Sequence, residues 1–290
     1  MMPRRAFPLG ALCAAALLAA PAVLAQPAYP SKPITIVVGY PPGGSTDLTG
    51  RTLGDALSRQ LGVPVVIENL GGAGGTIGAQ KVASAAPDGY TLLVGANNEV
   101  AISKLVTKTV KYELKDFTPL GLIASQPMVL VASTATGVKN LGEFIAKAKA
   151  APGKYSYGSS GVGTALHLAG EMVKERAGVF MTHIPYRGVA PLTSDLVGGN
   201  LEYGVFVLSS GLPHIKSGKV VALGTTEARR SPLTPDIPAL GEHPQLKGID
   251  IGTWFVLMGP ARLPEAVTTR LKTALAEALK SPEFRQKMEA

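Results

Sequence analysis

Cysteine is almost missing from the chain. Its 290 residues contain one, Cys13, within an apolar run near the N-terminus. A mature chain without that run would have no disulfide, no thiolate metal ligand and no cysteine nucleophile. Aromatic residues are also scarce, at 6%, so the stacking platforms of a single-strand nucleic-acid binder are lacking.

The residue patterns of several metal, cofactor and enzyme classes are absent too. No two of the four histidines have the i, i+4 spacing of a zinc helix, and no acidic cluster has calcium-loop spacing. The glycine cluster Gly71–Gly78 fails the dinucleotide pattern, because Ile77 stands where the last glycine belongs. Neither a P-loop nor the G-x-S-x-G turn of serine hydrolases occurs. We therefore expect no metal and no cofactor.

Charge is present in small excess and is scattered. The net charge is +8, and the longest basic runs are pairs such as Arg229-Arg230. This distribution lacks the basic cluster of a nucleic-acid interface, so no nucleic-acid partner is expected. A generally positive field does favour the capture of anions.

The N-terminal apolar run has the features of an export signal. Two arginines precede the segment Leu9–Ala20, which is shorter than the roughly 20 residues that span a bilayer, and Val23-Leu24-Ala25 offers a cleavage site. We expect residues 1–25 to be a signal peptide cleaved near Ala25, and the mature protein to be periplasmic. Both Sec export and twin-arginine export fit this segment.

Short β-branched runs alternate with amphipathic stretches along the rest of the chain. The runs are apolar throughout, which is typical of strands buried on both faces. Strand followed by helix, repeated, predicts parallel sheets, and the length suits two α/β lobes. The expected strands are Ile34–Val38, Val65–Ile67, Thr91–Val94, Val129–Ala132 and Val220–Gly224. The expected helices are Asp47–Gln60, Gly75–Ala85, Leu141–Ala150, Thr164–Arg176 and Pro264–Leu279.

No low-complexity linker separates the two lobes, so the chain must cross between them and return. The extended apolar segments Leu120–Val131 and Val221–Thr226 are the candidate crossings. We expect residues 26–124 to form the first part of lobe 1, 125–223 lobe 2, and 224–290 the returning part of lobe 1.

Two glycine-rich turns lead from a predicted strand into a predicted helix. The first is Tyr40–Asp47, and the second is Gly158–Thr164 before the helix that contains His167. Free N–H groups and the positive end of a helix dipole make such a turn an anion site. We expect Ser45, Thr46 or Asp47 to cap the first helix, and Gly44 to have positive φ. An ordinary helix start would give the same pattern, but two turns in different lobes suggest a pincer on one carboxylate.

Two further groups of residues have open roles. Asn97 and Asn98 follow the Thr91–Val94 strand, where their amides either read the far end of a ligand or only form a turn. Ser159 or Ser160 with His167 could serve a secreted ester hydrolase, although turn formation is the commoner role of such serines. His167 could instead line a cleft or pack in its helix.

Several segments together resemble the substrate-binding receptors of tripartite tricarboxylate transporters, the Bug receptor family. They are Tyr29–Val38, Pro41–Asp47, Glu68-Asn69 with Gly72–Gly78, Ala86–Leu93, Ile184–Gly188 and Leu212–Gly218. The match keeps its order from about Tyr29 to the C-terminus.

The resemblance implies an α/β periplasmic-binding-protein fold, with two Rossmann-like lobes, a hinge and a ligand cleft between them. It implies a monomeric solute receptor rather than an enzyme, with membrane permease subunits or a membrane sensor as partner. The site it implies includes Tyr186, Arg187 and the segment near Phe206, facing the cleft from lobe 2. With the two turns and the asparagines, the expected ligand-binding residues are Tyr40, Pro42, Gly43, Gly44, Ser45, Thr46, Asp47, Asn97, Asn98, Gly158, Ser159, Ser160, Gly161, Gly163, Thr164, His167, Tyr186, Arg187 and Phe206.

The chain departs from the family at three points. Leu70 replaces a common basic residue, and Val207 stands where an acidic residue is frequent, which disfavours an amino-acid ligand. The chain also stops at Ala290, so the last piece of lobe 1 is expected to be shortened. Aromatic acids, citrate-like acids and small dicarboxylates all remain candidate ligands.

Overall fold

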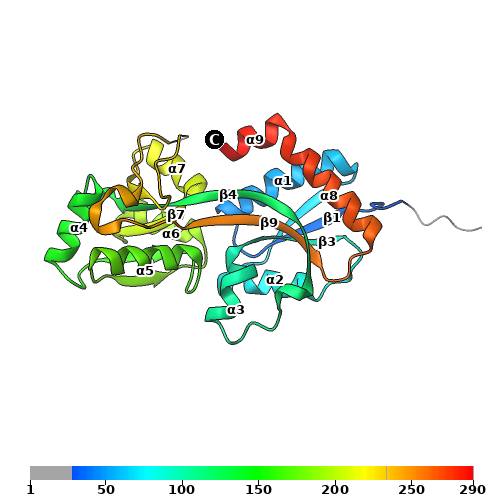
Figure 1. Cartoon of the computed structure of the whole chain (residues 1–290), viewed down its shortest axis with the longest axis horizontal. Coiled ribbons are helices and arrows are strands. Elements are labelled where there is room, and N and C mark those ends of the chain that lie inside the picture. The colour runs from blue at the N-terminus through cyan, green and yellow to red at the C-terminus, as the bar shows by residue number, and fades with distance from the viewer. Residues whose placement is uncertain (1–27, 233, 290) are drawn as a thin grey trace, which may run out of the picture.

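Two lobes lie side by side and are joined by two long strands (Figure 1). The computed structural model describes residues 28–232 and 234–289. The expected signal peptide, residues 1–25, lies outside the described residues. The joining strands are β4 (Phe117–Ser133) and β9 (Gly252–Pro260), which pair antiparallel from Phe117↔Pro260 to Pro127↔Gly252.

Lobe 1 is a mixed sheet with helices on both faces. Its strand order is β2-β1-β3-β9-β4, in which the first three strands run parallel and β9 is antiparallel to both β3 and β4. Its further strands are β1 (Ile34–Val38), β2 (Val65–Asn69) and β3 (Thr91–Ala96). Its helices are α1 (Ser45–Leu61), α2 (Thr76–Ala83), α3 (Ser103–Val106), α8 (Glu265–Lys280) and α9 (Pro282–Glu289).

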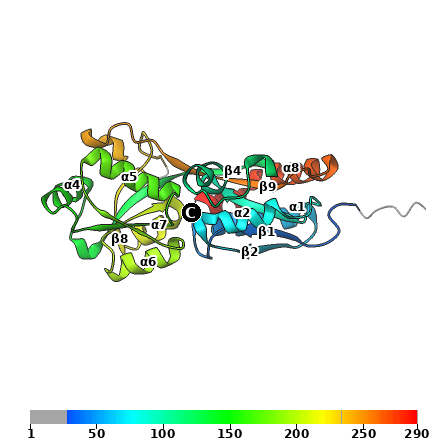
Figure 2. The ribbon, with the colours of Figure 1, turned by 90° about the horizontal axis from the view of Figure 1, so that it is seen from below.

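Lobe 2 is built on the second half of β4. That half pairs antiparallel with β7 on one side and β8 on the other, and β5 and β6 continue the sheet in parallel beyond β7. The further strands are β5 (Ser156–Ser159), β6 (Thr182–Pro185), β7 (Tyr203–Val207) and β8 (Val220–Thr225). The helices are α4 (Leu141–Ala150), α5 (Ala165–Ala177), α6 (Val189–Gly198) and α7 (Leu208–Lys216). Seen from below in Figure 2, helices cover both sides of this sheet as well.

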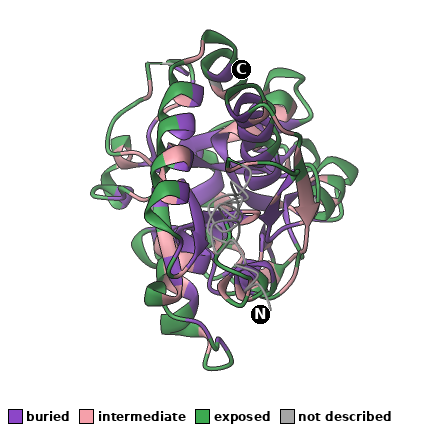
Figure 3. Ribbon diagram, turned by 90° about the vertical axis from the view of Figure 1, so that its right-hand side faces the viewer, coloured by how far each residue is buried: buried purple, intermediate pink, exposed green. Residues whose placement is uncertain are grey.

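Burial explains why the central strands are apolar on both faces. Four of the five side chains of β1 are buried, because α1 and α2 cover opposite sides of the sheet (Figure 1). Figure 3 shows the burial of the strands between the helices. Helix α1 approaches closely through Gly50, where an added Cβ would lie 2.8 Å from Val38 Cγ2. The helix ends at Gly62, whose left-handed conformation lets its N–H bond to Ser58 O.

All five expected strands and all five expected helices are present, and the first expected crossing is confirmed as part of β4. The second crossing is wrong. Val220–Thr225 is β8, which stays in lobe 2 and pairs with β4, and the following segment packs there too, with the turn Pro244–Leu246 against α5. The chain therefore returns to lobe 1 at residue 252, through β9, and not at 224. The two crossing strands also make the sheets mixed rather than purely parallel.

Candidate functional site

The first glycine-rich turn joins β1 to α1 at the interface of the lobes. The N-cap of α1 is Gly44, at φ −92° and ψ 172°, and the helix starts at Ser45. The expected capping by Ser45, Thr46 or Asp47 is therefore wrong, and positive φ lies at Gly43 (91°) rather than at Gly44. Since no side chain caps the helix, its first N–H groups are available to an incoming acceptor.

Asp47 supports this turn from behind. Its carboxylate accepts hydrogen bonds from Gly43 N–H (2.9 Å), Arg51 Nε (3.0 Å) and Asn69 Nδ2 (2.8 Å). Burial alone would raise the pKa of Asp47, but these donors hold it below the ordinary value. The carboxylate is thus saturated by the protein, and Asp47 and the exposed Pro42 do not line the cavity described below.

The second turn joins β5 to α5 in lobe 2. Thr164 is the N-cap of α5 and accepts a hydrogen bond from His167 N–H (3.3 Å). Ser159 is fully buried, with its Oγ 2.7 Å from Nε2 of His183. Ser160, the next residue, lines the cavity between the lobes. Because successive residues of a strand point to opposite faces, only one of the two serines can face the cleft.

The two histidines beneath this turn form a half-buried stack. The rings of His167 and His183 are 4.1 Å apart, and His167 Nδ1 accepts a hydrogen bond from Gly163 N–H (3.1 Å). Burial, reinforced by its neighbour His167, lowers the pKa of His183 to about 4. The serine that contacts a histidine, Ser159, is therefore inaccessible to an ester, and its partner is His183 rather than the expected His167. This geometry does not suit a hydrolase.

A cavity lies between the two turns. The space in it that is open to water is about 30 Å³, which is narrow, and its walls come from both lobes. Its lobe 1 wall is formed by Tyr40, Pro41, Gly44, Ser45, Thr46, Ala96 and Asn98. Its lobe 2 wall is formed by Ser160, Leu166, Val189 and Val207, and β9 contributes Thr253 and Phe255.

None of these lining side chains carries a formal charge, and four helices begin at the cavity walls. They are α1, α5, α6 and α7, and their N-terminal residues contribute Ser45, Leu166, Val189 and Val207 to the lining. Three of the four have no side-chain cap. Converging helix N-termini with unused N–H groups give a positive potential without a cation. Such a cavity can bind an anion through backbone N–H groups and hydroxyls.

Asn98 connects the two lobes across this cavity. Its Oδ1 accepts from Ala165 N–H, the first helical N–H of α5, at 2.6 Å, and its Nδ2 donates to Tyr40 Oη at 2.6 Å. Tyr40 Oη donates in turn to Gly74 O (3.0 Å). Asn97 points elsewhere: it accepts from Thr253 Oγ1 (2.9 Å) and donates to Gly252 O, so it fastens β3 to the start of β9.

A wider recess of about 300 Å³ adjoins the cavity and shares Tyr40 and Ser160 with it. Its wall includes the Gly72–Gly75 loop from lobe 1, and Gly161, Tyr186 and Arg187 from lobe 2. The Tyr186 hydroxyl donates to Asp195 (2.7 Å), whereas Arg187 is exposed and forms no salt bridge with any described residue. Arg187 is the one cation of this wall, at the entrance rather than within the cavity.

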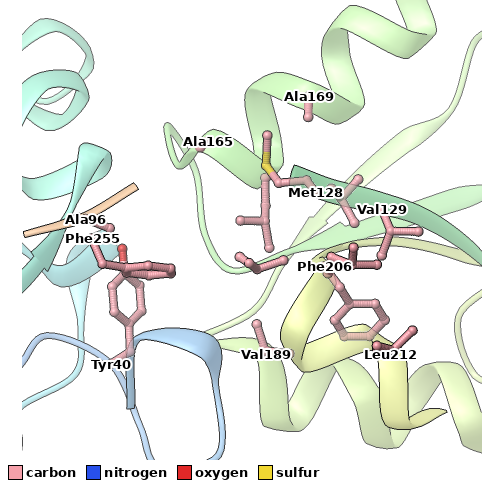
Figure 4. Packing of buried hydrophobic residues seen from close by; sticks show 14 of the residues in the cluster. Tyr40, Ala96, Met128, Val129, Ala165, Ala169, Val189, Phe206, Leu212 and Phe255 are labelled. Atoms are coloured by element: carbon pink, nitrogen blue, oxygen red, sulfur yellow. The ribbon is translucent and has the colours of Figure 1, made fainter. Parts of the chain in front are cut away.

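The expected orientation of Phe206 is wrong. Its side chain is fully buried and packs with Leu212 inside lobe 2, on the far side from Tyr40 and Phe255 (Figure 4). Val207 lines the cavity instead. The starts of α6 and α7 and the β9 residues Thr253 and Phe255 were missed by sequence reasoning. The sequence did hold a signal for the start of α6, because Gly188 directly precedes that helix.

Comparison with known proteins agrees with this architecture. The model of the tripartite tricarboxylate transporter family receptor, TctC, matches residues 49–290. The chain belongs to this family. Protein BugT of Bordetella pertussis is 34% identical over 277 residues, which cover 94% of this chain and 83% of BugT. The TctC family consists of periplasmic solute-binding proteins, so the chain is a solute-binding receptor of that type.

Two solved TctC-like structures carry a named ligand. A Rhodopseudomonas palustris protein with adipate is 32% identical, with a TM-score of 0.87, over 90% of this chain and 87% of that one. MatC of the same organism, with bound malate, is 30% identical, with a TM-score of 0.84, over 89% and 88%. Both similarities confirm the expected two-lobe periplasmic-binding-protein fold for this TctC receptor. In its described part, no helix is long and apolar enough to cross a membrane.

Proposed function

We propose that this receptor captures a small carboxylate in the cavity between its lobes. The observation that carries the proposal is the lining: helix N-termini and hydroxyls from both lobes, with no formal charge, around one narrow cavity between the lobes. An anion bound there accepts charge-assisted hydrogen bonds, which are stronger than neutral ones. The malate and adipate of the two solved relatives support a carboxylate as the ligand class.

The ligand contacts belong to the two turns and to Asn98. Ser45 and Thr46 serve lobe 1, Ser160 serves lobe 2, and Asn98 and Tyr40 supply polar atoms at the seam of the lobes. Asp47, Ser159, Thr164 and His167 act one layer behind, by holding the turns in place, and Asn97 fastens β3 to the start of β9. The apolar lining from Leu166, Val207 and Phe255 packs on the carbon skeleton of the ligand.

A panel of carboxylates tests the proposal. Malate, adipate, citrate and benzoate are screened by thermal shift, and each binder is measured by calorimetry beside its amide, for example adipamide beside adipate. A ligand at 100 times its dissociation constant stabilises the protein by about 2.7 kcal/mol. An amide that binds as tightly as its acid, or a panel with no binder, contradicts the proposal.

We further infer that the receptor works outside the cytoplasm and delivers its ligand to the membrane components of a tripartite transporter. Family membership and the predicted signal peptide support this inference. N-terminal sequencing of the periplasmic protein should give a start at Gln26. Uptake of the identified acid by cells should require both this receptor and the membrane components, and uptake that survives deletion of the receptor would contradict the role.

A further inference from the structure

Glu99 is a buried carboxyl group that the proposed binding site does not use. It follows Asn98 directly and lies in the single π-helical turn Asn98–Ile102 after β3. Its side chain is 1% exposed. Oε2 accepts a hydrogen bond from Ala96 N–H (3.0 Å), whereas Oε1 has no hydrogen-bond partner. The π-turn thus places a half-satisfied carboxyl next to the residue that bridges the lobes.

The free oxygen of Glu99 lies against the glycine loop at the cleft entrance. A Cβ added to Gly75 would be 2.3 Å from Oε1, so only glycine fits there, at φ +91°. Gly74 accepts the Tyr40 hydroxyl and faces Thr164 of lobe 2, where an added Cβ would lie 3.6 Å from Thr164 Cγ2. The carboxyl therefore supports both lobe 1 segments that meet lobe 2: the Asn98 turn and the Gly72–Gly75 loop.

No cation balances this group. Among the described residues, no Lys, Arg or His forms a salt bridge with Glu99. The titratable side chains that act on it are the phenols of Tyr40, from the β1–α1 turn, and Tyr112, whose hydroxyl donates to Glu99 O (2.9 Å). Burial raises the pKa of both phenols, so both are neutral near pH 8. Burial likewise raises the pKa of Glu99, to about 8.

We propose that Glu99 is a proton-coupled positioning residue beside Asn98 and the Gly72–Gly75 loop, so that capture of an anion next to Asn98 is accompanied by proton uptake at Glu99. The inference rests on the proposed carboxylate function. An anion beside Asn98 disfavours a second, uncompensated negative charge on the neighbouring residue. By linkage, anion binding raises the proton affinity of Glu99. At a pH where the free protein has lost this proton, the protein takes it up again when the anion binds.

The experiment is calorimetric titration of adipate and malate, each in two buffers with different ionisation enthalpies, at pH 7 and pH 9. For one coupled proton, the dissociation constant of the wild type should rise about tenfold from pH 7 to pH 9, with uptake of close to one proton per ligand at pH 9. Both acids are fully ionised in this range. His167 and His183, whose pKa values burial lowers, are neutral throughout.

Two variants separate the role of Glu99 from the general effect of removing one negative charge from the protein. Glu99→Gln keeps the shape and the Ala96 contact without a titrating group, so its affinity should be independent of pH and its binding should take up no proton. Glu175→Gln, at an exposed position on α5, removes the same charge and should behave as the wild type.

The outcomes are distinct. Carboxylate binding with no proton uptake at pH 9, or uptake that persists in Glu99→Gln, overturns the role of Glu99 while the proposed function stands. Absence of carboxylate binding at either pH overturns the proposed function itself. If Glu99→Gln does not fold, the absence of proton uptake and of pH dependence in the wild type still overturns the inference.

Discussion

The different surroundings of Ser159 and Ser160 allow a sharp test of the proposed binding cavity. Ser160 lines it from lobe 2, Ser45 lines it from lobe 1, and Ser159 is turned inward to His183. Replacing Ser45 or Ser160 by alanine removes a hydroxyl that we expect to bond to the ligand carboxylate. Replacing Ser159 by alanine removes a hydroxyl that only the protein uses.

The expected magnitudes follow from these positions. A lost hydrogen bond to a charged group costs about 1 to 3 kcal/mol, or roughly 5- to 150-fold in the dissociation constant, for Ser45→Ala and for Ser160→Ala. Ser159→Ala should leave affinity within about threefold of wild type, but should lower the free energy of unfolding by about 1 to 2 kcal/mol, because the partly buried Nε2 of His183 loses its partner.

The assay is a double-mutant cycle in calorimetry, run with the best carboxylate of the panel and with its amide. If both turns hold one carboxylate, the Ser45→Ala, Ser160→Ala double variant should deviate from additivity by at least about 0.5 kcal/mol. The amide should blunt both single effects. Strict additivity, or a larger effect on affinity from Ser159→Ala than from Ser160→Ala, refutes the two-turn pincer as the structure presents it.

Three further predictions concern the elements that hold the site. Gly43→Val should destabilise the protein by about 1 to 2 kcal/mol in denaturant titration, because φ is +91° there, whereas Gly44→Ala, at φ −92°, should be nearly neutral; equal effects would contradict the assigned turn. Asp47→Asn should cost about 1 to 2 kcal/mol at pH 7. Because the pKa of Asp47 is lowered in the fold, this difference should vanish as the pH falls through that pKa; a constant difference would count against the network. Glu99→Gln should gain stability over the wild type as the pH rises from about 4.5 to about 8, by up to about 1.4 kcal/mol per unit. The unfolded carboxyl ionises in that range while the folded one stays protonated, and parallel curves would contradict a protonated Glu99.

Local features of the sequence were sufficient for the five expected strands, the five expected helices and the position of both turns, whereas β9 and the helices α6 and α7 were not among them. The segment Ile34–Val38 is predicted as a buried strand because all five residues are β-branched and four of them are apolar. The glycines that follow it predict a turn. The family likewise follows from short segments that occur along this chain in the same order as in the family. The strand, turn and motif patterns depend only on residues that are close together in the chain.

Tertiary structure decided which residues face the ligand and where the chain returns. Val220–Thr225 is as apolar as a crossing strand, and its pairing with β4 keeps it in lobe 2, so that β9 and not β8 is the second strand that crosses between the lobes. Ser160 rather than Ser159, and Val207 rather than Phe206, line the cavity, because a shift of one residue reverses the side chain and nothing in the sequence marks the register. The convergence of α1, α5, α6 and α7 on one space depends on how two sheets meet through β4 and β9, which is a property of contacts between residues far apart in the chain.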